Sequence, residues 1–217
     1  MDKRIWMVGL ALAIGLSRAG LALAWNEGDP LQSEALKLTP DIAKGRELYN
    51  VICSGCHEET AWGTSDGTFP EIAGQHRSVL IKQLTDIRAL NRDNPVMYPF
   101  TLPGIIGGAQ EIADVTAYVE SMPVSRHNGL GPGTALDQGK QLYNERCASC
   151  HGAQGEGSAQ AFYPRIQGQH YAYVLRQLNW MKNGKRRNAN PEMLKHLKGF
   201  SSEEMSAVSD YIAHMKP

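Results

Sequence analysis

Two C-x-x-C-H motifs place the strongest constraint on this chain. They lie 94 residues apart and contain all four cysteines of the 217-residue sequence. Such a motif is typical of c-type haem attachment, because two thiols three residues apart at a helix start can add to the two vinyl groups of one porphyrin. The adjoining histidine then points at the iron. The motifs predict two covalently bound haem c groups, held by Cys53, Cys56 and His57 and by Cys147, Cys150 and His151.

Other uses of paired cysteines fit the sequence less well. A thioredoxin-like thiol pair is expected in a βαβ context, and no such pattern surrounds either motif. A zinc site would require a second ligand pair beside each motif. Two disulfides are normal for an exported chain with four cysteines, but the spacing argues against them. The haem interpretation is therefore favoured.

The motifs belong to a longer internal repeat. At an offset of 94, the residues Gly45, Leu48, Tyr49, Asn50, Pro70, Ile72, Gly74, Gln75, His76, Gln83, Leu84 and Arg92 recur as Gly139, Leu142, Tyr143, Asn144, Pro164, Ile166, Gly168, Gln169, His170, Gln177, Leu178 and Arg186. The offset changes to 96 at Met97 and Met193, and to 93 at Tyr118 and Tyr211. A duplicated domain of about 90 residues is small for a protein-only core, so a covalent haem would supply apolar volume.

Each repeat predicts an all-helical unit. Apolar residues at helical spacing indicate helices over 41–52, 76–90 and 110–122, and over 135–146, 170–183 and 202–215 in the second copy. Gly45 and Gly139 leave room for another helix to approach closely, and Tyr118 and Tyr211 would fill the space beside it. No alternating strand pattern competes.

The N-terminus resembles an export signal. Lys3 and Arg4 precede an apolar stretch, and Ala-Leu-Ala at 22–24 offers a cleavage site. The alternative is an uncleaved anchor over 5–24, in which Arg18 would cost about 2.5–3.5 kcal/mol on insertion scales. No later segment is expected to span a membrane.

The expected organisation is a signal peptide over 1–24 and two domains joined by a short linker. The N-terminal domain covers 25–123, the linker rich in Gly and Pro covers 124–134, and the C-terminal domain covers 135–217. Because so short a linker restrains both domains, we expect them to pack together with their haems near enough for internal electron exchange.

Charge is balanced overall but divided between the two domains. With 22 basic and 22 acidic residues, the chain lacks the basic surplus of a nucleic-acid binder. Residues 25–123 carry 7 basic and 14 acidic side chains, and residues 124–217 carry 12 and 7. This division predicts a basic partner at the first domain and an acidic one at the second. The run Lys185-Arg186-Arg187 is expected to be a solvated face.

Together these features resemble a known family. Two tandem units, each with C-x-x-C-H, P-x-I-x-G-Q, a Gln-Leu helix and Asn-Pro-x-Met before the last helix, resemble class I cytochrome c domains and, as a pair, the dihaem cytochromes c4. The resemblance runs from Thr39 to Met215. It implies an all-α fold of two tandem class I cytochrome c domains related by pseudo-twofold symmetry, with one covalent haem each, and a periplasmic electron carrier.

The proximal iron ligands follow from the motifs as His57 and His151. A proximal histidine needs an acceptor for its other ring nitrogen. The resemblance assigns that role to the carbonyls of Pro70 and Pro164. The alternative is that these prolines merely end loops.

For the distal ligands, the resemblance implies Met97 and Met193, each expected in a loop two residues after a proline. Repetition alone does not select them. Met122 and Met215 also recur, as helix residues more typical of core packing, and His76 and His170 recur as helix-start residues more typical of the surface or of capping. Methionine–histidine ligation raises the reduction potential and leaves no open iron position, which suits electron transfer.

Two further features bear on the haem environments. Arg92 and Arg186 are candidates to bind haem propionates, because a guanidinium offers two parallel donors, and exposed helix-end cations are the equal alternative. Glu58, Glu59 and Asp66 follow the first motif, where the second has uncharged residues. Their negative charge predicts a lower reduction potential for the N-terminal haem.

The expected function is a periplasmic relay of electrons between a membrane quinol-oxidising complex and a terminal oxidase or reductase, without a catalytic residue. The alternatives are the electron-accepting haem subunit of a specific periplasmic dehydrogenase, for example one acting on a sulfur compound, and a dihaem peroxidase. A peroxidase needs one haem that opens a coordination position, whereas both halves carry Asn-Pro-x-Met. The expected partners are redox proteins, and a loose association of the chain with a membrane is compatible with this role.

Overall fold

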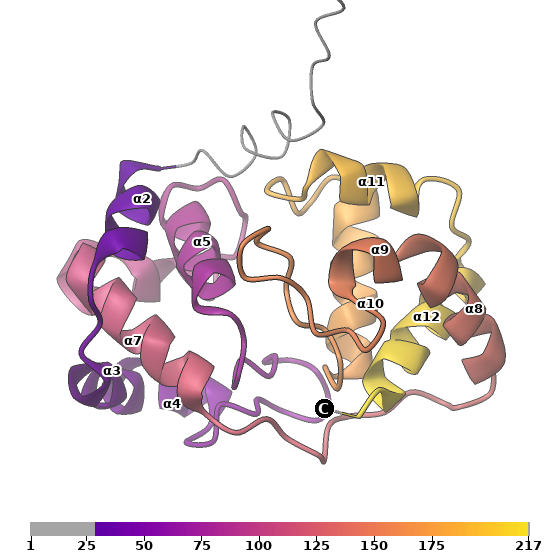
Figure 1. Ribbon diagram of the computed structural model, residues 1–217, viewed down its shortest axis with the longest axis horizontal. Helices are drawn as coiled ribbons and strands as arrows, with labels where there is room; N and C mark the ends of the chain where they lie inside the picture. The colour runs from indigo at the N-terminus through magenta and orange to yellow at the C-terminus, as the bar shows by residue number, and fades with distance from the viewer. Residues whose placement is uncertain (1–28, 217) are drawn as a thin grey trace, which may run out of the picture.

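The computed structural model describes residues 29–216, which form two helical halves lying side by side (Figure 1). The N-terminal half contains α2 (Pro30–Lys37), α3 (Ile42–Leu48), a π-helix η1 (Tyr49–Cys53), α4 (Ser54–His57), α5 (Arg77–Arg88), a 3-10 helix η2 (Tyr98–Thr101), α6 (Pro103–Ile106) and α7 (Ala109–Ser121). The C-terminal half contains α8 (Leu136–Arg146), α9 (Ala148–His151), α10 (Tyr171–Lys182), α11 (Pro191–Leu197) and α12 (Ser202–His214).

The all-α prediction is confirmed. Residues 29–216 contain no strand, and their one isolated β-bridge joins Ser158 and Tyr163. No helix within this part of the chain is long and apolar enough to cross a membrane. The expected signal peptide over 1–24 lies outside the described residues.

In each half, the helix that leads into the Cys motif crosses the last helix at a glycine. A Cβ atom on Gly45 in α3 would lie 2.1 Å from the carbonyl oxygen of Asp114 in α7. A Cβ atom on Gly139 in α8 would lie 2.2 Å from the carbonyl oxygen of Ala207 in α12. The backbones can therefore approach this closely only because a side chain is missing, as the sequence predicts.

Tyrosine pairs fill the space beside both crossings. The rings of Tyr49 and Tyr118 have centroids 5.6 Å apart, and those of Tyr143 and Tyr211 are 5.7 Å apart. Tyr49 and Tyr143 are fully buried, and each hydroxyl donates a 2.6 Å hydrogen bond to a backbone carbonyl nine residues later. These hydrogen bonds tie the crossing helices to the segments that follow the Cys motifs.

The sequence misses several short helices, and one of them changes the place of a candidate ligand. Met97 lies in the turn before η2, as expected, but Met193 is the third residue of α11 and not part of a loop. The Asn190 side chain caps α11 by accepting a 2.8 Å hydrogen bond from the backbone N–H of Glu192, and Pro191 is its first residue. Asn-Pro here starts a helix.

The two halves are joined by reciprocal glutamine contacts. Gln75 accepts a 2.9 Å hydrogen bond from the backbone N–H of Arg165 and donates a 2.8 Å one to its carbonyl. Gln169 does the same for Glu71, at 3.0 and 2.7 Å. The recurring Gly-Gln sequence therefore serves as a joint between the halves.

The repeated histidines also contact the opposite half. His170 is 2% exposed, and its Nε2 lies 2.7 Å from the carbonyl oxygen of Trp62. His76 Nε2 lies 2.8 Å from the carbonyl oxygen of Glu156. Neither side chain makes a capping hydrogen bond. The expected surface or capping role is wrong for His170, because the packing of the two halves buries it.

Candidate functional site

One continuous cavity of about 540 Å³ extends through both halves. It lies between the Cys motifs and the inner faces of α5 and α10. Both motifs and both methionines implied by the resemblance line it: Cys53, Cys56, His57 and Met97 in the N-terminal half, and Cys147, Cys150, His151 and Met193 in the C-terminal half. The structure therefore brings each proposed ligand set together in the lining of the same cavity.

The two motif histidines have matching environments. His57 is 6% exposed, with Nδ1 3.0 Å from the carbonyl oxygen of Pro70, and His151 is 7% exposed, with Nδ1 3.0 Å from that of Pro164. Burial lowers the pKa of both imidazoles. A neutral ring that donates from Nδ1 to a carbonyl leaves the Nε2 lone pair available to a metal ion.

The four cysteines are unpaired thiols, all partly buried. Cys53 ends η1 and Cys147 lies between α8 and α9, so each pair sits at the start of the short helix that carries its histidine. Burial raises the pKa of Cys53 and of Cys147 to about 12. Within residues 29–216, no group of three or more His, Cys, Asp or Glu side chains is placed to hold a metal ion, so the structure gives neither cysteine pair the second ligand pair of a zinc site.

The cavity distinguishes between the candidate distal ligands. Met122 packs against the core of the N-terminal half, and Met215, which is 9% exposed, belongs to the core of the C-terminal half. Neither contributes to the lining of the cavity, and neither do His76 and His170. Within the described residues, Met97, Met181 and Met193 line the cavity. Met181 has no methionine counterpart in the first copy of the repeat, where Ile87 stands at the equivalent position, whereas Met97 and Met193 correspond to each other.

Arg92 and Arg186 meet at the boundary of the halves in a cluster with two glutamines, the Arg–Gln cluster. Arg92 Nη1 donates to Gln83 Oε1 at 2.7 Å, and Arg92 Nη2 donates to Gln177 Oε1 at 3.2 Å. Arg186 Nη1 donates to Gln177 Oε1 at 3.0 Å, and Arg186 Nη2 donates to Gln83 Oε1 at 3.2 Å. Each arginine thus bridges both halves. The exposed helix-end alternative is wrong for Arg92, which is 7% exposed.

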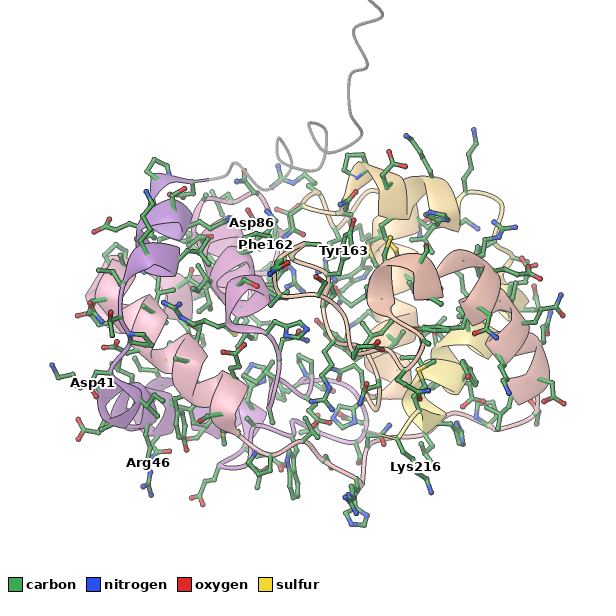
Figure 2. The ribbon with its side chains drawn as sticks, viewed as in Figure 1. Asp41, Arg46, Asp86, Phe162, Tyr163 and Lys216 are labelled. Atoms are coloured by element: carbon green, nitrogen blue, oxygen red, sulfur yellow. The ribbon has the colours of Figure 1, made fainter. Side chains whose placement is uncertain are left out.

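The Arg–Gln cluster concentrates positive charge at the cavity wall. Burial and the neighbouring Arg92 guanidinium lower the pKa of Arg186 to about 9. The hydrogen bonds within the cluster end on neutral amide oxygens. Nearby Asp86, on the side of α5 that faces the C-terminal half (Figure 2), is bound by Lys82 Nζ at 2.9 Å. Two converging guanidiniums that line a cavity fit anionic groups such as haem propionates.

The basic run of the C-terminal half is used within the molecule. Arg187 Nη2 lies 2.6 Å from Asp93 Oδ1 of the N-terminal half, with both side chains about half exposed. Lys185 is exposed, as expected. The expectation that this run forms a solvated face is wrong for Arg186 and incomplete for Arg187. Both side chains contact the N-terminal half, and Arg187 does so through an ion pair with Asp93.

Sequence reasoning did not single out two further residues of the cavity wall, Glu71 and Arg165. They follow Pro70 and Pro164 directly, and the 94-residue offset places them at equivalent positions. Glu71 is 8% exposed. The signal was a charge reversal within a conserved-looking internal repeat, P-E-I-A-G-Q against P-R-I-Q-G-Q.

Comparisons with known proteins agree with this geometry. The Cytochrome c family model matches residues 42–123 and 136–216. A cytochrome c4 of Pseudomonas aeruginosa is 30% identical over 217 residues, covering 95% of this chain and 96% of that protein. A thiosulfate dehydrogenase electron acceptor of Stutzerimonas stutzeri is 29% identical over 198 residues, covering 83% of this chain and 90% of that protein.

The fold has a matching solved structure. The crystal structure of reduced recombinant cytochrome c4 from Pseudomonas stutzeri superposes with a TM-score of 0.72 at 26% identity, covering 82% of this chain and all of that one. The two family matches each contain one cysteine pair, Cys53 with Cys56 and Cys147 with Cys150. The chain belongs to the cytochrome c family, as a dihaem electron carrier of the cytochrome c4 type with two covalent haem c groups.

Proposed function

We propose that this chain relays electrons between redox proteins through two haems with histidine–methionine ligation, His57 with Met97 and His151 with Met193. The observation that carries the proposal is the cavity, which each of these side chains lines and which the repeated alternatives Met122, Met215, His76 and His170 do not. When bound, each haem supplies a reversible one-electron couple at its iron. The protein's contribution is to fix the ligands, the charges and the access of water.

The two histidines act as oriented neutral ligands. The 3.0 Å contacts to the carbonyls of Pro70 and Pro164 hold each ring in one tautomer and increase its electron donation. Met97 and Met193 would be the second protein ligands of the two irons. An iron held by two protein ligands would have no position open to a substrate, which favours a carrier over a peroxidase.

The Arg–Gln cluster would hold propionates of both haems at the boundary of the halves. Arg92 and Arg186 each contact both Gln83 and Gln177, so a propionate bound by either arginine is fixed relative to both halves. This arrangement supports direct electron exchange between the haems within one molecule. The cluster thus serves both haem binding and internal relay.

The cellular setting is the periplasm in this proposal. Residues 1–24 act as a signal peptide removed after Ala24, residues 25–123 and 135–217 form the two domains, and residues 124–134 link them. The donors and acceptors are redox proteins such as a quinol-oxidising complex and a terminal oxidase. No catalytic residue is required in this role.

A second candidate function is that of electron acceptor for a particular dehydrogenase. It is favoured by the relative from Stutzerimonas stutzeri, whose name describes a thiosulfate dehydrogenase electron acceptor. The haem sites would be the same in either role, because only the electron donor changes. The rates at which a purified thiosulfate dehydrogenase and a purified quinol-oxidising complex reduce the ferric protein would distinguish the two.

The ligand assignment is tested by replacing methionines one at a time. Met97→Leu and Met193→Leu should each remove about half of the weak red-edge sulfur-to-iron charge-transfer band of the ferric protein, since each removes one axial sulfur. Met122→Leu and Met215→Leu are matched controls from the same repeat and should keep the whole band. A full band in Met97→Leu or in Met193→Leu would contradict the assignment for that haem.

A further inference from the structure

The two haem sites carry opposite charges at one equivalent position. Glu71 follows Pro70, and Arg165 follows Pro164, and these prolines supply the carbonyls that contact His57 and His151. Glu71 and Arg165 both line the cavity. The two copies of the repeat therefore carry the same proposed ligands. They differ in the charge of the residue that follows the proline, which is negative at Glu71 and positive at Arg165.

The carboxyl group of Glu71 is buried and fixed in place. Its side chain is part of a residue that is 8% exposed, and its Oε1 accepts a 2.7 Å hydrogen bond from the backbone N–H of Ser125. The backbone of Glu71 is held on both sides by the Gln169 amide. The carboxyl group consequently cannot turn out into solvent without breaking its hydrogen bond to the backbone of Ser125 in the linker.

One cation acts on this carboxyl group from the opposite half. The Arg165 guanidinium lies against Gly74, where an added Cβ would be 2.8 Å from its Nη1. Burial raises the pKa of Glu71 to about 7, while the Ser125 N–H and the Arg165 charge act in the lowering direction. The other groups that hold Glu71, the Gln169 amide and the Ser125 backbone, are uncharged.

We propose that Glu71 is a redox-linked proton-binding group of the N-terminal haem site, taking up a proton when that iron is reduced and releasing it on oxidation. The electron comes from the donor protein and the proton from bulk water, and no bond other than the O–H bond of the carboxyl group forms or breaks. This inference rests on the proposed placement of a haem against His57.

The physical cause is electrostatic linkage. Reduction lowers the charge of the iron site by one unit, which makes a nearby buried carboxylate less favourable and a carboxylic acid more favourable. Because linkage is reciprocal, the protonated carboxyl must in turn favour the reduced iron. The exposed Glu58, Glu59 and Asp66 are screened by water, and the buried carboxylate of Asp86 is paired with Lys82. Glu71 is the carboxyl group of this half that lines the cavity, which places it to exert such an effect.

The C-terminal site lacks this device. Arg165 occupies the equivalent position, and a guanidinium keeps its proton throughout the neutral range. The two haems should therefore respond differently to pH. Acidification protonates Glu71 and so raises the reduction potential of the N-terminal haem. Arg165 keeps its charge, so it adds no pH dependence to the reduction potential of the C-terminal haem.

The test is spectropotentiometric titration of the haem-loaded protein from about pH 5 to about pH 9. One of the two midpoint potentials should fall with rising pH, by at most about 59 mV per pH unit, which corresponds to a tenfold change for a one-electron couple. Glu71→Gln should make that potential independent of pH and keep it near the low-pH value of the wild type. The amide retains an oxygen that can accept the Ser125 N–H, so this hydrogen bond to the linker is preserved.

Glu59→Gln is the matched control, because Glu59 is an exposed carboxylate close to the same motif. It should leave the pH dependence unchanged. Two flat midpoint potentials in the wild type would overturn the proposal. So would a slope that persists in Glu71→Gln, which would assign the proton to another group such as a propionate.

A second measurement needs no variant. Stoichiometric reduction of the wild-type protein in weakly buffered solution near pH 7, followed with a pH indicator, should show uptake of a fraction of a proton per molecule, and absence of uptake would also overturn the proposal. The sulfur-to-iron band should stay intact in Glu71→Gln. Failure of the ligand assignment and failure of this inference are therefore distinguishable.

Discussion

His170 is a buried side chain whose two hydrogen bonds depend on the protonation state of its ring. The backbone N–H of Gly129 donates to His170 Nδ1 at 2.9 Å, so Nδ1 acts as the acceptor, and the proton on Nε2 then points to the carbonyl oxygen of Trp62 at 2.7 Å. The neutral ring satisfies both contacts. A protonated ring would bring a second N–H against the Gly129 donor.

This geometry predicts a loss of stability in acid. Burial lowers the pKa of His170 below its ordinary 6.5. In the unfolded chain the ring protonates near 6.5, so the stabilising contribution is present above that pH and is lost as the pH falls below it, by up to about 1.4 kcal/mol per pH unit. Chemical denaturation of the haem-loaded protein at about pH 7.5 and about pH 5.5 measures it. His170→Gln should lose less stability over this interval than the wild type, and equal losses would contradict the prediction.

At the scale of elements, helices with a continuous apolar stripe were predictable and short capped helices were not. The ranges predicted for α5, α7, α10 and α12 differ from the observed bounds by at most two residues at either end. The helices α2 and α11 are too short for a helical period of apolar residues to be recognised. The sequence signals for their starts were the capping residue and proline pairs Asp29-Pro30 and Asn190-Pro191. Helix 41–52 was predicted as one element, whereas α3 continues through the π-helix η1 to α4.

The crossing of α3 and α7 makes a prediction about element packing. Gly45→Ala would place a Cβ 2.1 Å from the carbonyl oxygen of Asp114, so α7 must shift. We expect a loss of about 1–3 kcal/mol in the free energy of unfolding, the usual cost of overpacking. Gly104→Ala is the matched control, because its Cβ would have no neighbour within 4 Å. It should change the stability by less than about 0.5 kcal/mol, and an equal effect of both substitutions would refute the role assigned to the crossing.

At the scale of the whole molecule, the sequence predicted two packed halves but not how they pack. The repeat indicated that Gln75, His76 and their counterparts matter without showing that they contact the opposite half. Contacts between distant parts of a chain leave no periodic signal, since each partner is separated from the other by about the length of a domain. Likewise, burial of Arg92 and Glu71 became visible only once both halves formed one cavity wall.

The reciprocal glutamine contacts predict how the halves hold together. Gln75→Ala with Gln169→Ala removes four hydrogen bonds across the boundary, each contributing about 0.5–1.5 kcal/mol. The two halves should then unfold at separate denaturant concentrations, measured from the absorption of each haem. Gln141→Ala with Gln154→Ala, which alters glutamines away from this boundary, should keep the wild-type unfolding behaviour. A single unchanged transition in the first variant would contradict the prediction.

The central claim is that both irons are held by a histidine and a methionine and serve only to relay electrons. The most direct measurement is the optical spectrum of the purified ferric protein, with the red-edge sulfur-to-iron band quantified per haem and repeated after addition of cyanide or peroxide. The account predicts the band at both haems and slow, weak binding of either reagent. A band at only one haem, with rapid binding at the other, would contradict it and indicate an open or differently ligated iron.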